Sequence, residues 1–82
     1  MFITYDILIG FNDGTFLSAV PQIEMDVSSV DELTLEDHTQ VCCDLLNHYC
    51  NQKRQMGELI CFGCEGNELT DQVKALLIPH SQ

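Results

Sequence analysis

Residues 1–20 read MFITYDILIGFNDGTFLSAV, and this stretch decides the fold class. One parity of residues 1–11 is entirely apolar or aromatic, which is typical of a strand with one buried face. The predicted buried side chains are Ile3, Tyr5, Ile7, Ile9 and Phe11. Asn12-Asp13-Gly14 tolerates the positive φ angles of a tight turn, and residues 15–20 return to a β-branched and aromatic composition. These residues therefore predict a β-hairpin.

Pro21 follows the hairpin and cannot donate a hydrogen bond to a sheet ladder. We therefore expect the second strand to lie at an edge, or to bulge at Pro21 before the alternation resumes over residues 23–27. Phe2 and Leu8 lie on the parity opposite to the buried face. A partner or a homodimer could cover that second face, although scattered surface apolar residues are the ordinary alternative.

The next predicted element is a long helix over residues 35–54. Thr34 and Asp37 have the spacing of an N-cap pair, and inward residues recur every three or four positions after them. The predicted stripe consists of Leu35, His38, Cys42, Leu45, Leu46 and Tyr49. Acidic residues at its start and basic residues at its end complement the helix dipole, and Gly57 is expected just beyond its end.

The last third of the chain predicts two more strands, over residues 58–64 and over Val73–Ile78, joined through a turn at residues 65–67. Thr70-Asp71-Gln72 leaves open a short helix through Leu77 in place of the final strand. The predicted fold is α+β, with the order β-β-α-β-β: a four-stranded antiparallel sheet with one long helix packed on one face. We expect a single domain over residues 1–82.

Charge limits the classes of partner. The chain has 13 Asp and Glu against 3 Lys and Arg, for a net charge of −10, and no basic residue precedes Lys53. Direct binding to nucleic acid or to an anionic membrane is therefore disfavoured, because phosphate contacts need clustered Lys and Arg. Residues 1–11 lack the positive charge of a targeting segment, and no stretch has the length and apolarity of a membrane span. The odd count of 5 cysteines favours free thiols, so we expect a cytoplasmic protein, of a cell or of a virus in its host.

Acidic residues form the predicted partner-binding site. Six of them fall within 14 residues, and a further one follows on the predicted helix. The seven are Glu24, Asp26, Asp31, Glu32, Glu36, Asp37 and Asp44. Duplex DNA carries about one negative charge per 1.7 Å of axis, so a protein surface of similar charge density can occupy a phosphate-binding groove. We therefore expect an inhibitor or adaptor that binds a basic, nucleic-acid-binding protein, including a DNA mimic of the anti-CRISPR or anti-restriction type. The alternative is that these acids only hydrate an exposed edge and cap a helix.

Cysteine and histidine form a second candidate site. Cys61 and Cys64 make a C-x-x-C pair, and His38 and Cys42 stand one turn apart on the predicted helix. Together they could hold zinc in a zinc-stabilised interaction module, but one such pair is a modest signal and buried free cysteines are common in cores. No metal or cofactor is therefore predicted, and a redox role is disfavoured because the C-x-x-C does not open a helix in a βαβ unit.

No sequence pattern for catalysis is present. The chain lacks a nucleophile elbow, a phosphate-binding glycine loop and a metalloprotease helix motif. A small sheet with one helix also leaves little volume for a substrate pocket, so we expect no enzymatic activity. An acidic structural subunit of a larger complex is the remaining alternative.

Overall fold

The structure is a computed structural model that describes residues 1–80, with side chains through Leu77. The last two residues of the predicted domain thus lie outside the described residues. The strands are β1 (Phe2–Phe11), β2 (Phe16–Ala19), β3 (Gln22–Glu24), β4 (Gly57–Cys64) and β5 (Asn67–Glu68). The helical elements are the 3₁₀ helix η1 (Val30–Glu32) and the α-helices α1 (Leu35–Lys53) and α2 (Thr70–His80). Neither α1 nor α2, as described, is both long and apolar enough to cross a bilayer.

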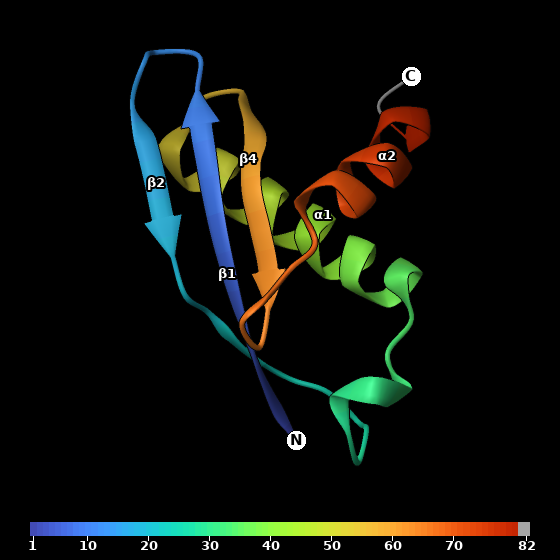
Figure 1. Ribbon diagram of the computed structural model, residues 1–82. Coiled ribbons are helices and arrows are strands. Elements are labelled where there is room, and N and C mark those ends of the chain that lie inside the picture. The colour runs from blue at the N-terminus through green and yellow to red at the C-terminus, as the bar shows by residue number, and fades with distance from the viewer. Residues whose placement is uncertain (81–82) are drawn as a thin grey trace.

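All strand pairs are antiparallel, and the sheet has the order β2-β1-β4-β5, with β3 paired to β1 (Figure 1). The α+β class, the antiparallel sheet and the long helix are therefore confirmed. β2 pairs with residues 7–10 of β1 and β3 with residues 2–4, so the two form one edge that is interrupted before Gln22. Pro21 lies in this interruption, and its carbonyl accepts a hydrogen bond from Tyr5 N at 2.9 Å. The break that Pro21 predicted is confirmed.

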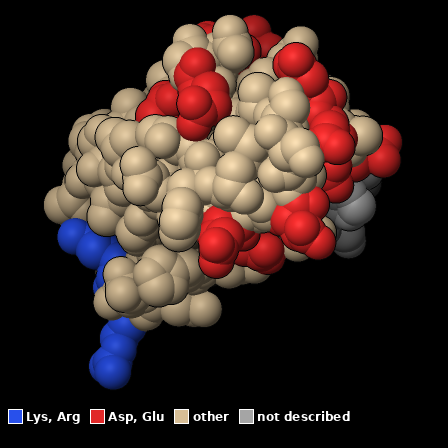
Figure 2. Space-filling view, turned by 90° about the horizontal axis from the view of Figure 1, so that it is seen from below, with Lys and Arg blue, Asp and Glu red and all other residues tan. Residues whose placement is uncertain are grey.

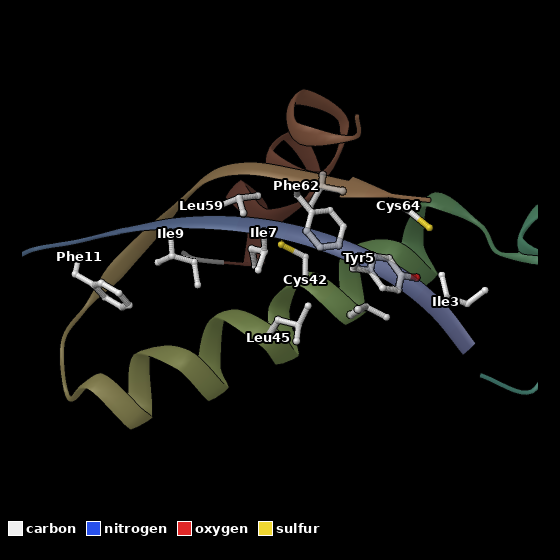
Figure 3. Packing of buried hydrophobic residues seen from close by; sticks show 12 residues of the cluster. Ile3, Tyr5, Ile7, Ile9, Phe11, Cys42, Leu45, Leu59, Phe62 and Cys64 are labelled. Atoms are coloured by element: carbon white, nitrogen blue, oxygen red, sulfur yellow. The ribbon is translucent and has the colours of Figure 1, made fainter. Parts of the chain in front are cut away.

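The core lies between one face of the sheet and α1 (Figure 3). The five inward residues of β1 are at most 6% exposed, as the alternation predicted. They meet Cys42 and Leu45 of α1 and Leu59, Phe62 and Cys64 of β4.

The buried face of α1 differs in part from the predicted stripe. Leu35 is 37% exposed, whereas Thr39 and Val41, which were not predicted, are buried. Val41 lies about 200° around α1 from Thr39, at about 100° per residue, so the two residues widen the buried face on opposite flanks. Leu76 of α2 lines the same hollow as Thr39, so the second helix accounts for the burial of Thr39.

Both ends of α1 have identifiable caps. Thr34 Oγ1 accepts from Asp37 N at 3.1 Å, and Asp37 Oδ2 accepts from Thr34 N at 2.9 Å, which completes a capping box. Arg54 ends the helix in the left-handed region, with φ 57°. Gly57, expected just past the helix, instead opens β4, where a Cβ would lie 2.9 Å from a methyl carbon of Ile9. Its lack of a side chain therefore serves the close approach of β4 to β1.

The predicted strand at Val73–Ile78 is wrong, because residues 70–80 form α2. The pairing with β4 ends just before this helix: Leu69 N donates to Phe62 O at 2.8 Å, and Phe62 N donates to Thr70 Oγ1 at 3.0 Å. Val73 is fully buried, and Leu69 and Leu77, four residues away on either side, pack against the core. This spacing is helical, so the alternative left open by the sequence is the one observed.

Candidate partner-binding surface

Six of the seven predicted acidic residues gather at one end of the molecule. The end of β3, η1 and the first turn of α1 lie together there, away from the β1–β2 hairpin (Figure 1). We call this region the acidic end, and it carries Glu24, Asp26, Asp31, Glu32, Glu36 and Asp37, all of them exposed. Asp44 is exposed too, but it lies about 12 Å along α1 from Glu36 at 1.5 Å per residue, and it accepts a hydrogen bond from Gln40 at 3.0 Å.

Two of these carboxylates have structural duties. The side chain of Glu32 accepts from the backbone N–H groups of Ser28 and Ser29 and closes the capping box of η1. Asp37 does the same for α1, and its hydrogen bonds with Thr34 hold the pKa of its carboxyl below the ordinary value. The alternative interpretation, that the acids cap helices, therefore holds for Glu32 and Asp37.

The other carboxylates of the acidic end are not needed by the fold in this way. Among the side chains of residues 1–77, none forms a hydrogen bond or ion pair with these carboxylates, nor does the described backbone. They are those of Glu24, Asp26, Asp31 and Glu36. Because they are exposed and free of such contacts, they are available to cationic groups of another molecule.

Sequence reasoning missed two further carboxylates at this end, those of Glu65 and Glu68. The turn between β4 and β5 contains Glu65 and Gly66, both at positive φ. The carboxylate of Glu65 accepts a hydrogen bond from Thr4 N. Asn67, which precedes Glu68, lines the same groove as Asp31 of η1. The pairing of Tyr5 with Cys64 places the residues after β4 beside the start of β1. A correct prediction of the strand register would therefore have placed these two carboxylates at the acidic end.

Two of the three Lys and Arg residues, Lys53 and Arg54, lie outside the acidic end, and the third, Lys74, is on α2. Lys53 forms an ion pair with Asp13 at 3.6 Å, at the hairpin turn, and its Nζ lies 5.5 Å from the centre of the Phe11 ring. Arg54 follows directly as the C-cap of α1. Figure 2 shows Asp and Glu in several groups over the face seen from below, with Lys and Arg confined to one margin. Lys53 and Arg54 therefore lie apart from the carboxylates of the acidic end.

A groove of about 230 Å³ separates η1 from the sheet. It is lined by Val30, Asp31, Leu33, His38, Cys64, Asn67 and Leu69. The imidazole Nδ1 of His38 lies 2.9 Å from the hydroxyl of Tyr5, and burial lowers the pKa of His38. Burial also raises the pKa of the Cys64 thiol. Burial thus favours the neutral forms of both the His38 imidazole and the Cys64 thiol.

The four residues considered for zinc do not converge. Cys61 is exposed, whereas Cys64, Cys42 and His38 are buried. A C-x-x-C pair inside a strand has odd spacing, so its two side chains point to opposite faces of the sheet. In the described part of the chain, no group of three or more His, Cys, Asp or Glu side chains is placed to hold a metal ion. In this arrangement the four residues therefore do not form one ligand set.

The described residues thus place an exposed array of carboxylates beside the groove between η1 and the sheet. A second hollow, of about 300 Å³, lies between α1 and α2, and Glu36 forms part of its wall. The chain matches no protein-family model, no curated protein and no solved structure.

Proposed function

We propose that this chain is an acidic protein-binding inhibitor or adaptor, and that its partner is a basic, nucleic-acid-binding protein in the cytoplasm. The observation that carries the proposal is the set of exposed carboxylates at the acidic end with no capping or pairing duty. Helix capping accounts for Glu32 and Asp37 only. Charge beyond the needs of the fold costs stability through self-repulsion, so a retained excess favours a role in binding.

The physical mechanism is substitution for phosphate. A basic groove that binds nucleic acid presents Lys and Arg at a spacing set by the phosphate backbone, and exposed carboxylates can occupy the same positions. Long-range attraction then speeds association, and salt weakens it. The finer form of the proposal is a DNA mimic of the anti-CRISPR or anti-restriction type, which blocks its partner by competing with nucleic acid.

The test uses carboxylates that have no capping role. Asp26→Asn, Asp31→Asn and Glu36→Gln together remove three negative charges from the acidic end. A matched control, Asn12→Lys, Gln52→Lys and Glu58→Gln, changes the net charge by the same amount at residues outside the acidic end. Tagged wild type and both variants are used to capture proteins from host extract at low salt, and the captured protein is then tested for competition with its DNA or RNA.

We expect wild type and control to capture the same nucleic-acid-binding protein and to release it as salt rises. Three lost surface pairs, at about 0.2–1 kcal/mol each, should weaken the acidic-end variant about 3- to 150-fold. Equal capture by both variants would show that the acidic end is not the binding site. Capture that ignores salt would instead fit the acidic structural subunit.

A further inference from the structure

The free edge of β2 is the feature that the proposed function leaves unused. Phe11 N donates to Thr15 O, and Tyr5 N donates to Pro21 O, each at 2.9 Å. In an antiparallel pair, alternate residues bond to the neighbouring strand, so residues 15, 17, 19 and 21 face β1. Phe16, Ser18 and Val20 therefore direct their backbone N–H and C=O groups away from the sheet.

Although β2 is short, with four residues, its edge lacks the side chains that usually prevent strand pairing. Natural edges carry charged side chains, or proline at an outward position, to prevent pairing with another chain. Residues 16–20 contain no charged residue, although the chain has a net charge of −10. Pro21 offers no protection, because its backbone faces β1. Phe16 is 69% and Val20 66% exposed, so the edge is apolar as well as uncharged.

The edge is also complementary to itself. Two copies of β2 paired antiparallel about a two-fold axis at Ser18 would place Phe16 of each copy opposite Val20 of the other. In this register the three outward residues form hydrogen-bonded pairs, each donating one bond and accepting one. Aromatic and β-branched residues are favourable cross-strand partners.

We propose that two copies of this chain pair through the β2 edge, in this register, to form a two-fold symmetric dimer with one continuous sheet. The alternative contact, face to face through the outer side of the sheet, is opposed by charge. Asp6 and Glu58 lie on that side, as the partners of Gly63 and Gly10 show, and two copies would bring these carboxylates together. The edge contact avoids this repulsion at its centre.

The size of the contact sets its strength. Five residues per copy form a smaller interface than the roughly 1,600 Å² of a standard stable complex. We therefore expect a reversible dimer that is populated only at high protein concentration. Each copy carries a net charge of −10, so the copies repel at long range and salt should strengthen the dimer. Binding of a basic partner should respond to salt in the opposite direction, and the two proposals can therefore fail separately.

The experiment is sedimentation equilibrium of the full chain from micromolar to millimolar concentration, at low and high salt. Ser18→Pro removes the N–H at the centre of the edge, which the monomer does not use, and Ser18→Ala keeps it. We expect wild type and Ser18→Ala to dimerise alike, and Ser18→Pro to raise the dimer dissociation constant at least about tenfold. A wild-type monomer throughout, or an unweakened Ser18→Pro dimer, overturns the proposal.

A second pair of variants keeps the test decisive if Ser18→Pro fails to fold. Val20→Asp adds a charge to the edge, and Gln52→Glu adds the same charge on α1. Only Val20→Asp should weaken the dimer. Amide hydrogen exchange gives the register: the amides of Phe16, Ser18 and Val20 should slow as concentration rises, while those of Leu17 and Ala19 stay constant. Exchange at all five that is independent of concentration contradicts the pairing.

Discussion

Tyr5→Phe tests whether the buried hydroxyl of Tyr5 holds the core to α1. Tyr5 is fully buried, its hydroxyl lies 2.9 Å from His38 Nδ1, and its ring stacks on Phe62 at 5.4 Å between centroids. Phenylalanine keeps the ring, its stacking and its volume. The substitution therefore removes the two hydrogen bonds of the hydroxyl, with His38 Nδ1 and with Met25 Sδ at 3.7 Å, without opening a cavity of the size left by a truncated side chain.

The expected loss is about 1–3 kcal/mol, because the nitrogen of His38 is left buried without a partner. An 82-residue domain has a total stability of about 4–12 kcal/mol, so the loss is a substantial fraction of it. With an m-value of about 1 kcal/mol per molar urea, the unfolding midpoint should fall by about 1–3 M.

Urea unfolding followed by far-ultraviolet circular dichroism is the assay, since the chain has no tryptophan. Tyr49→Phe is the matched control: Tyr49 is half-buried on α1, and its hydroxyl has no hydrogen bond to the described side chains of residues 1–77 or to the described backbone. The control should stay within about 0.5 kcal/mol of wild type. If Tyr5→Phe also stays within that range, the hydroxyl–imidazole contact does not stabilise the core and the reasoning is refuted.

Three further predictions concern His38, the cap of α1 and the anchor of α2. Burial lowers the pKa of His38 below 6.5, so the unfolded chain binds the proton more readily. The contribution of His38 to stability should therefore be constant above about pH 7 and fall below pH 6.5 by at most about 1.4 kcal/mol per pH unit. The stability of His38→Gln should no longer depend on pH in this range, whereas that of His48→Gln should keep the wild-type dependence. Equal slopes of stability against pH in both variants would contradict the assignment of the dependence to His38. Thr34→Ala should cost about 1 kcal/mol in urea unfolding by removing the acceptor for Asp37 N, and an unchanged midpoint would mean that the cap contributes nothing. Val73→Ala should lower the free energy of unfolding by about 1–3 kcal/mol and should accelerate amide exchange more in α2 than in α1. Equal acceleration in both helices would show that α2 does not open separately.

The local elements were predictable because their signals are local. The alternation from Ile3 to Phe11 and the pair Thr34 and Asp37 each specify an element through neighbours a few residues away. The C-terminal element was predicted wrongly because Val73 to Ile78 has both β-branched residues and good helix formers. In the structure, the side chain of Thr70, at the start of α2, hydrogen-bonds the backbone of Phe62 eight residues earlier. Such a contact depends on strand register, which composition does not reveal.

The acidic surface was predictable in part for the same reason. Clustering from Glu24 to Asp37 is visible in the sequence, since those residues follow one another along the chain. The contribution of Glu65 needs the pairing of β1 with β4, and the structural duty of Glu32 needs the geometry of η1. The sequence therefore shows where acidic residues cluster, whereas the fold shows which carboxylates hydrogen-bond to the backbone and which are free of such contacts.

Salt ties the two proposals together in one measurable contrast. The acidic end should bind a basic partner more weakly as ionic strength rises, because the attraction between opposite charges is screened. The β2 edge carries no charge, so its pairing is limited by repulsion between the rest of the two copies, and screening should favour it. If both associations weaken with salt, charged groups must take part in the dimer contact. The register centred on Ser18 would then be wrong even if a dimer forms.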